Sequence, residues 1–433
     1  MKKIISAIAL QKRISIIELV ILTIVGLAIF CNDLLSVEFQ PDETFWIVSS
    51  VRLDEFVKGN LESAVWDERL DTYEVRPIPS YFAAISQRLG NVKPADIPPD
   101  YWNWSESIEN NILNGAMPAD KVLYYSRLPM AILGVFSIVL MTIMLAFTHS
   151  RLAGYIFYIF CFNDYFLLHL RRAMSESSLL FFTVLVMAAM FRLLSEIKNK
   201  NVKQIFIWSI IVGVISGFAG QSKLTGLACA ILAIGLSFLS IYRYGLAKQK
   251  IGLKIFRLTS ILISFVTVII FIASYPFFYQ KTIQRIAGTF YTRQSVVKIQ
   301  MTDFPADIIE PGQRLNILLN RVFDYPYHIP NNDNNLIIPI FMLSITSFGI
   351  YYAIKQILSD NEETHKYLVL LFSLLTFGVP MLITPLDWDR YYLYPIFFSG
   401  IFFSIGFVQL SKILIENILK VFPLKIRPEV ASL

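Results

Sequence analysis

Long apolar runs recur along the chain, separated by stretches of polar residues. Ten of them approach the length of a membrane-spanning helix, which needs about 20 predominantly apolar residues. They lie at about 14–35, 124–148, 151–170, 176–195, 204–222, 224–242, 255–278, 335–354, 367–385 and 391–411. The pattern predicts an all-α polytopic membrane protein with about ten or more transmembrane helices.

Two segments between these runs are long and polar, at 36–121 and 279–334. Connections of more than about 12–15 residues are usually functional or disordered. The first segment holds four tryptophans and apolar residues at helical spacing, so we expect it to contain amphipathic helices that lie on the membrane surface. The spaced residues are Phe82, Ile85 and Leu89, and Phe45, Val48 and Val51. We treat residues 1–433 as a single membrane domain with two long outer loops.

The distribution of basic residues predicts the orientation of the helices, because cytoplasmic loops are rich in Lys and Arg. Segments that alternate to the cytoplasmic side hold 20 basic and seven acidic residues. Of the totals of 38 basic and 32 acidic residues, the rest of the chain holds 18 and 25. We therefore expect both termini in the cytoplasm, both long loops outside, and the first run retained as an anchor.

Composition excludes other classes of protein. Of the 433 residues, 55% are apolar and 16% are charged, against about 25% charged in soluble domains, and the mean hydropathy is +0.57. The three cysteines show no metal-binding or disulfide spacing. The net charge of +6 comes from basic residues that are not clustered among aromatic residues, so we expect no nucleic-acid partner.

Asp42 and Glu43 lie a few residues beyond the outer end of the first apolar run. An acidic pair after proline is typical of the first turn of a helix, where carboxylates interact favourably with the helix dipole. Alternatively, one carboxylate could take a proton from an acceptor hydroxyl at the membrane surface. Spacing alone leaves both readings open.

Basic residues at outer helix ends oppose the topology rule and need a reason. Arg171 and Arg172 could pair with Glu176 or extend toward lipid head groups, and Lys223 could do the same between two apolar runs. Alternatively, these cations could bind a substrate phosphate, which guanidinium groups match well. Asp389, Arg390 and Tyr391 open the last run, where charged and aromatic residues are also common at a membrane interface. Because all these clusters fall on one predicted side, we favour the functional reading.

In this order, the clusters resemble the GT-C fold of integral membrane glycosyltransferases, in the branch of protein O-mannosyltransferases and aminoarabinose lipid A transferases. The resemblance is clearest over residues 15–230. Glu176 departs from it where Asp is more usual, as do Gln221 and Ser222 before Lys223. The residues that carry it are Asp42-Glu43, Arg127-Leu128-Pro129, Arg172 with Glu176, Gly217–Gly226 with Lys223, and Arg390-Tyr391 with Pro395.

The resemblance implies an inverting transfer of a hexosyl or pentosyl unit from a polyprenyl-phosphate donor to a lipid, glycan or protein acceptor outside the cytoplasm. Asp42 would be the catalytic base, and cations would hold the departing phosphate. Glu43 would position substrate or bind a metal. The sequence requires no cofactor, and the resemblance leaves a divalent ion open. The residues expected to bind substrate are Glu43, Arg127, Arg171, Arg172, Glu176, Lys223, Asp389, Arg390 and Tyr391.

We expect this protein in a bacterial plasma membrane. Two other functions stay open. A flippase of lipid-linked sugars would need polar residues along a path through the bilayer, whereas the charges here collect at one surface. A membrane scaffold would leave the outer charges as solvated loop residues.

Overall fold

The computed structural model describes residues 14–246, 249–327, 337–359 and 363–421. Among these, eight helical segments are long and apolar enough to cross a membrane, which confirms the predicted all-α polytopic class. Their helices are α8 (Asp120–Thr148), α11 (Ser175–Asn199), α12 (Val202–Ser222), α13 (Ala228–Arg243) with η4 (Leu224–Leu227), α14 (Lys250–Ala273), α17 (Ile337–Leu358), α18 (Thr364–Gly378) with η9 (Val379–Leu382), and α19 (Leu393–Val421) with η10 (Asp389–Tyr392).

The other two predicted spans are helical but short. α2 (Ile16–Phe30) has 15 residues, and the run 151–170 divides into α9 (Arg151–Phe160) and α10 (Asp164–His169). The division has a local cause, because the Asn163 side chain accepts a hydrogen bond from the backbone N–H of Phe166 and starts a new helix. The expected count of ten spanning helices is therefore not confirmed, although all ten runs form helices.

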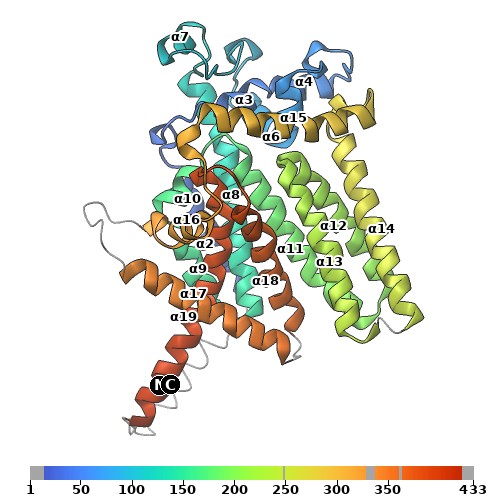
Figure 1. Ribbon diagram of the computed structural model, residues 1–433, viewed down its shortest axis with the longest axis vertical. Helices are drawn as coiled ribbons and strands as arrows, with labels where there is room; N and C mark the ends of the chain where they lie inside the picture. The colour runs from blue at the N-terminus through green and yellow to red at the C-terminus, as the bar shows by residue number, and fades with distance from the viewer. Residues whose placement is uncertain (1–13, 247–248, 328–336, 360–362, 422–433) are drawn as a thin grey trace.

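Three helices form the centre of the bundle. In α8, α11 and α19, between 67% and 78% of the most apolar 18-residue stretch is buried, whereas the same measure is 28% in α14 and α17. In Figure 1, α12, α13 and α14 flank this centre on one side, and α17 crosses it on another. The outer helices expose large apolar residues such as Ile261 and Phe265 of α14, as expected of a surface that faces lipid.

Glycines allow two helix pairs to approach closely. A Cβ atom at Gly349 of α17 would lie 1.8 Å from the carbonyl oxygen of Phe402, and one at Gly406 of α19 would lie 2.1 Å from that of Ile345. Gly217 of α12 meets α14 in a similar way. Small residues at such crossings let helix backbones pack together where the hydrophobic effect does not drive association.

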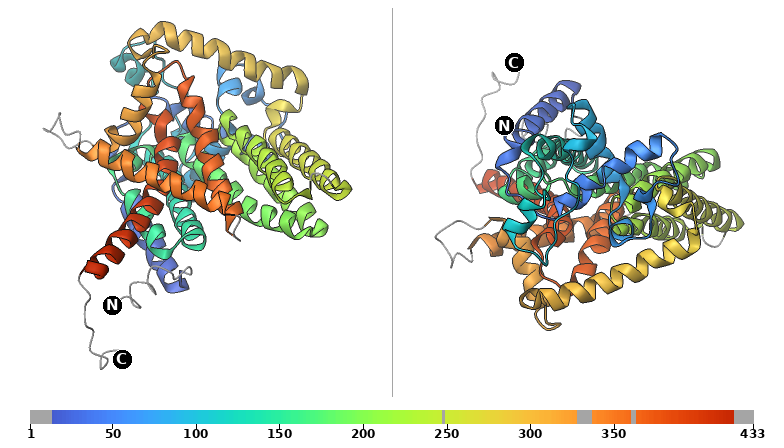
Figure 2. Two further views of the ribbon diagram at one scale, coloured as in Figure 1. Left: turned by 60° about the horizontal axis from the view of Figure 1, so that its bottom comes forward. Right: turned by 90° about the horizontal axis from the view of Figure 1, so that it is seen from above.

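The first long loop and the first part of the second fold into helices over one end of the bundle (Figure 2). The Phe82, Ile85, Leu89 stripe falls on α6, where Ile85 and Leu89 are exposed and the opposite face is buried, in agreement with the expected amphipathic helix. In Figure 1, α15 extends across the same end, above α6. The loop helices are α3 (Glu43–Val48), α4 (Val51–Val57), α5 (Leu70–Glu74), α6 (Pro77–Leu89), α7 (Ile108–Leu113), α15 (Thr282–Asp303) and α16 (Arg314–Phe323).

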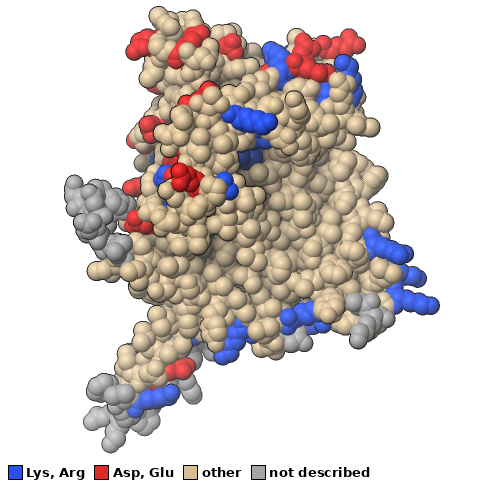
Figure 3. Space-filling model, viewed as in Figure 1, with Lys and Arg blue, Asp and Glu red and all other residues tan. Residues whose placement is uncertain are grey.

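On the face drawn in Figure 3, acidic and basic residues gather at opposite ends of the bundle. Asp and Glu gather over the end formed by the long loops, while Lys and Arg dominate the opposite end. This is the asymmetry on which the predicted orientation depends.

We expect Gly406→Ala to lower the thermal midpoint of the detergent-purified protein, because the added methyl group pushes α19 away from α17. Overpacking of this kind costs about 1–3 kcal/mol. Gly235→Ala is the matched control: a Cβ there meets nothing within 4 Å, and alanine favours the helix by up to about 1 kcal/mol. Equal midpoints for the two variants would contradict the close packing of α17 and α19.

Candidate active site

The turn that begins α3 points two neighbouring carboxylates in different directions. Asp42 is the N-cap of α3 and Glu43 is its first residue. The backbone N–H of Gln40 donates to Glu43 Oε1 at 3.1 Å, which turns the Glu43 side chain back into the protein. Glu43 is fully buried, whereas the Asp42 side chain is 19% exposed and lines a cavity.

Glu43 forms a buried ion pair with Arg127 of α8. Arg127 donates from Nε and Nη2 to the two carboxylate oxygens at 2.8 and 2.6 Å. Its Nη1 donates to the carbonyls of Leu34 and Val37, and the backbone N–H of Ala173 donates to Glu43 Oε2 at 2.7 Å. The pair thus joins three other parts of the chain to the start of α3. Neither Glu43 nor Arg127 lines the cavity.

Arg171 and Arg172 bind backbone carbonyls. Arg171 donates to the carbonyl oxygens of Asn32 and Asp33, the latter at 2.8 Å, and Arg172 donates to that of Glu38 at 3.3 Å. Burial lowers the pKa of both guanidinium groups from the ordinary arginine value. Both residues brace the segment between α2 and α3, and neither lines the cavity.

Asp42 is held between two nitrogen donors. Arg390 Nη1 donates to Asp42 Oδ2 at 2.6 Å, and the indole N–H of Trp104 donates to Oδ1 at 3.3 Å. The Arg390 guanidinium lies over the rings of Trp388 and Tyr391, at 5.0 and 5.9 Å from their centroids. Donors that lie 62 and 348 positions away along the chain therefore fix the orientation of the Asp42 carboxylate.

Lys223 and Glu176 form the second ion pair of the cavity. Lys223 lies where α12 breaks into η4, and its Nζ donates to Glu176 Oε1 at 3.1 Å, 5.6 Å from the centre of the Tyr391 ring. The break is tight, because a Cβ at Gly226 would lie 2.1 Å from the carbonyl oxygen of Ala219. Glu176 lies in the first turn of α11, where the helix dipole favours a carboxylate.

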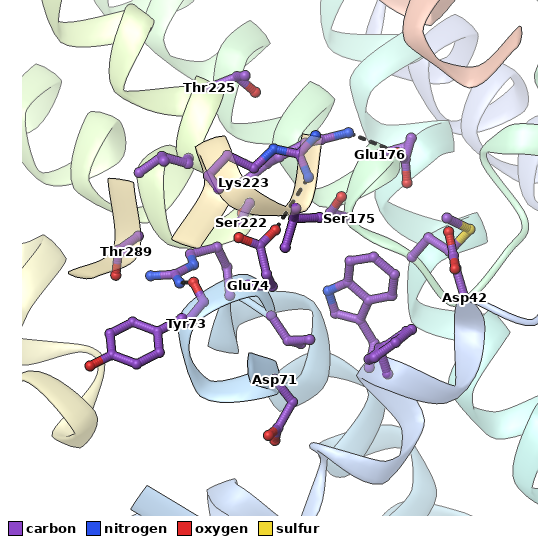
Figure 4. Close-up of a pocket in the computed structure, with 18 of the residues that line it drawn as sticks. Asp42, Asp71, Tyr73, Glu74, Ser175, Glu176, Ser222, Lys223, Thr225 and Thr289 are labelled. Carbon is purple, nitrogen blue, oxygen red and sulfur yellow. Dashed lines mark hydrogen bonds and ion pairs between the residues drawn. The ribbon is translucent and has the colours of Figure 1, made fainter. Parts of the chain in front are cut away.

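The cavity has a volume of about 360 Å³ and brings together half of the predicted substrate and catalytic residues (Figure 4). Asp389 lies just outside it, with its carboxylate 3.4 Å from His169 Nε2. The predicted residues that line the cavity are Asp42, Glu176, Lys223, Arg390 and Tyr391; those that do not are Glu43, Arg127, Arg171, Arg172 and Asp389.

One wall of the cavity comes from α15, in the second long loop, where we predicted no site residue. Its lining residues are Thr289, Arg293, Val296 and Gln300, which are spaced at 4, 3 and 4 residues and so share one helix face. That spacing was visible in the sequence. The sequence did not show which face of the helix would pack against the bundle.

The first long loop also contributes residues that sequence reasoning missed. Glu74 pairs with Arg293 at 3.2 Å, and Asp71 pairs with the fully buried Arg52. Arg76 is also buried, and its hydrogen-bond acceptor is the backbone carbonyl of Tyr73. Burial lowers the pKa of Arg76. Arg76 forms no ion pair with any acidic residue that the structure describes.

Several buried polar atoms of the cavity residues have no hydrogen-bond partner among the described residues. These atoms include hydrogen-bond donors and acceptors, so a ligand with several hydroxyl groups or charges would satisfy them. The atoms are Trp46 Nε1, Arg76 Nη1, Ser175 Oγ, Glu176 Oε2 and Gln300 Oε1.

Within the described ranges, no group of three or more His, Cys, Asp or Glu side chains is placed to hold a metal ion. We expected Glu43 to position substrate or to bind a metal. Both of its carboxylate oxygens already accept hydrogen bonds, from Arg127 and from the backbone N–H of Ala173.

Comparison with known proteins identifies the fold that carries this site. Residues 102–287 match the family model described as dolichyl-phosphate-mannose-protein mannosyltransferase. No curated protein matches the sequence. Among solved structures, the archaeal oligosaccharyltransferase AglB from Archaeoglobus fulgidus, in complex with an inhibitory peptide and a dolichol-phosphate, is 12% identical with a TM-score of 0.50. ArnT from Cupriavidus metallidurans, bound to undecaprenyl phosphate, is 13% identical with a TM-score of 0.51.

The AglB likeness covers 94% of this chain and 52% of AglB, and the ArnT likeness covers 96% of this chain and 65% of ArnT. This chain therefore spans about half the length of AglB and just under two thirds of ArnT. At such low identity, the likeness establishes the fold: the chain is a multi-pass membrane protein with the GT-C fold, as the sequence resemblance predicted.

We expect Glu43→Gln to destabilise the protein strongly, because it leaves Arg127 charged, buried and unpaired. Breaking a buried pair costs about 3–5 kcal/mol. The thermal midpoint of the purified protein in detergent is the measurement. Glu55→Gln, which breaks a pair whose Lys58 side chain is 66% exposed, should change stability by at most about 1 kcal/mol. A midpoint for Glu43→Gln as high as that of Glu55→Gln would show that the buried pair does not hold α3.

Proposed function

We propose that this protein is an inverting membrane glycosyltransferase. It moves a hexosyl or pentosyl unit from a polyprenyl-phosphate donor to a hydroxyl group of a lipid, glycan or protein acceptor. The observation that carries the proposal is the meeting, in one cavity at one end of the bundle, of the partly exposed Asp42 carboxylate with Lys223, Arg390 and Arg76.

The charges of the cavity suit a phosphate. Four acidic residues and four basic residues line it, and three of the basic residues already pair with acids: Lys223 with Glu176, Arg293 with Glu74 and Arg390 with Asp42. Arg76 is the fourth. A buried guanidinium with an unused donor attracts an anion strongly, because little water competes for it.

The fold supports a polyprenyl carrier for the sugar. AglB and ArnT, whose folds this chain shares, were solved with dolichol-phosphate and undecaprenyl phosphate, respectively. Both ligands are long isoprenoid chains that end in a phosphate. A carrier of this kind would place its phosphate at the end of the bundle and its tail along the exposed apolar helices.

Each of these side chains has one task in the proposed transfer. Asp42 accepts the proton of the acceptor hydroxyl as that oxygen attacks C1 of the sugar from the face opposite the phosphate. The bond between C1 and the phosphate oxygen breaks, and its electron pair leaves on the phosphate, where Lys223, Arg390 and Arg76 stabilise the growing charge. Glu43 and Arg127 position Asp42, and Arg171 and Arg172 brace the adjoining segment.

The separation of charge between the two ends of the bundle supports the proposed orientation. The acidic end, which carries the cavity and the long loops, would face outward, and both termini would lie in the cytoplasm. The short, basic inner loops favour a bacterial plasma membrane.

We expect Asp42→Asn to abolish transfer without loss of folded protein, because the amide keeps the shape of the carboxylate but cannot accept the proton. Mass spectrometry of polyprenyl-phosphate sugars and glycans, from cells with equal membrane levels of each variant, measures this. The expected result is accumulation of one lipid-linked sugar together with loss of one glycan. Asp100→Asn, at an exposed position of the same loop, is the control.

Other outcomes of this experiment would overturn the proposal. Full transfer by Asp42→Asn would remove Asp42 as the base. Accumulation of the lipid-linked sugar on the cytoplasmic face alone would favour a flippase. Unchanged profiles after deletion of the whole protein would exclude the transferase and favour a scaffold.

We expect Arg76→Gln to raise the dissociation constant for undecaprenyl phosphate about tenfold, which corresponds to about 1.4 kcal/mol. The protein should stay folded, because Arg76 leaves no acid unpaired when it is removed. Binding to the detergent-purified protein is measured by native mass spectrometry. Lys58→Gln, in the same loop and with a side chain that is 66% exposed and pairs with Glu55 outside the cavity, should bind the lipid as the wild type does. Equal affinity of both variants would remove Arg76 from the phosphate site.

A further inference from the structure

Asp42 has a second side that faces away from the cavity. One of its oxygens binds Arg390, which lines the cavity, and the other accepts the indole N–H of Trp104, which does not. Trp104 is 51% exposed, although large aromatic side chains are usually mostly buried. The carboxylate therefore lies between the cavity and an exposed aromatic ring.

Two other aromatic residues hold Trp104 in place. The ring of Phe304, at the end of α15, contacts that of Trp104 edge-on, with centroids 6.1 Å apart. Phe304 in turn contacts Trp388 at 5.8 Å, and the Trp388 indole donates to Asp307 Oδ2 at 3.0 Å. We call Trp104, Phe304 and Trp388 the aromatic rim. It joins the first long loop, the second long loop and the segment before α19 around Asp42.

Acidic residues surround the aromatic rim, and Arg390, which lies over the Trp388 ring, is already paired with Asp42. Glu106 and Asp303 are exposed and lie close in sequence to Trp104 and Phe304, and Asp307 contacts Trp388. Repulsion by these carboxylates disfavours an anionic ligand. The described residues contain a single isolated β-bridge, between Ile308 and Leu386, and so offer no strand edge to pair with an extended peptide.

We propose that Trp104 positions both the catalytic base and the acceptor, and that the acceptor is an uncharged saccharide. This inference rests on the proposed function. The face of the indole packs against the C–H groups of one sugar ring, while the indole N–H keeps the Asp42 carboxylate turned toward a hydroxyl of that ring. The donor then occupies the cavity on the other side of Asp42, so the two substrates meet at the carboxylate.

Fluorine NMR of the full-length protein labelled with 5-fluorotryptophan tests the binding step without any need for transfer. The chain has six tryptophans, and Trp104→Phe assigns the resonance of Trp104 by removing it. The probes are the methyl glycosides of glucose, galactose and mannose, added to about 100 mM so that millimolar binding is detected. An uncharged peptide with one serine, acetyl-Ala-Ser-Ala-amide, is the competing acceptor class.

The expected result is a saturable shift of the Trp104 resonance with at least one glycoside, and none with the peptide. The resonance of Trp208, within α12, should not move. No shift with any glycoside would overturn the inference, and a shift with the peptide alone would favour a protein acceptor. This titration needs neither the lipid-linked donor nor transfer, so failure of the proposed function would not be mistaken for failure of this inference.

Kinetics separate the two roles of Trp104 once the lipid-linked donor is in hand. Trp104→Phe keeps a ring but loses the N–H, and we expect kcat to fall about five- to tenfold with little change in the acceptor KM. Trp104→Ala loses both, and we expect the acceptor KM to rise at least tenfold as well, with the donor KM unchanged. Tyr291→Ala, which removes an aromatic ring of α15 that is 73% exposed, is the control. A wild-type acceptor KM in Trp104→Ala would refute the contact with the acceptor.

Discussion

The arrangement of the cavity depends on the buried ion pair between Glu43 and Arg127. Two charges without exposure to water are stable only when each finds partners with good geometry, and here all the donors and acceptors come from different parts of the chain. The pair therefore fixes where α3 begins against α8. Since Asp42 is the residue immediately before Glu43, the position of the proposed base follows from a contact that lies outside the cavity.

The two neighbouring carboxylates show how one short sequence can serve stability and chemistry together. Glu43 accepts hydrogen bonds from a bidentate arginine and from the backbone N–H groups of Gln40 and Ala173, so both of its oxygens are engaged within the protein. Asp42 has single contacts from Arg390 and Trp104 and stays partly exposed. The two side chains differ by only one methylene group, so their chemical type does not distinguish their proposed roles. The difference in their contacts and burial does.

Much of this molecule could be predicted from the sequence because a bilayer imposes strict rules on apolar length and basic charge. All ten predicted runs are helices, and Asp42, Glu176, Lys223, Arg390 and Tyr391 meet as expected. The features that could not be predicted have a common origin in tertiary contacts. Arg171 and Arg172 have the composition of a phosphate site, yet they bind carbonyls. Arg76 and Arg293 look like ordinary loop residues until the turn between α5 and α6 and the helix α15 bring them to the cavity. The short helices α9 and α10 reflect one asparagine cap within an otherwise apolar run.

The charge count of the cavity has a consequence for turnover. Four basic and four acidic residues line the cavity, and the buried Arg52 pairs with Asp71, so these residues carry one surplus positive charge, which a singly charged phosphodiester donor balances. Arg69, which also pairs with Asp71, is 53% exposed, so water screens its charge. Transfer as proposed leaves a doubly charged phosphate and a protonated Asp42, so the balance is kept during the reaction. Once Asp42 returns its proton to water, one negative charge is in excess while the spent carrier is still bound. Resetting the base would then weaken the hold on the carrier, so that deprotonation and product release become a single coupled event.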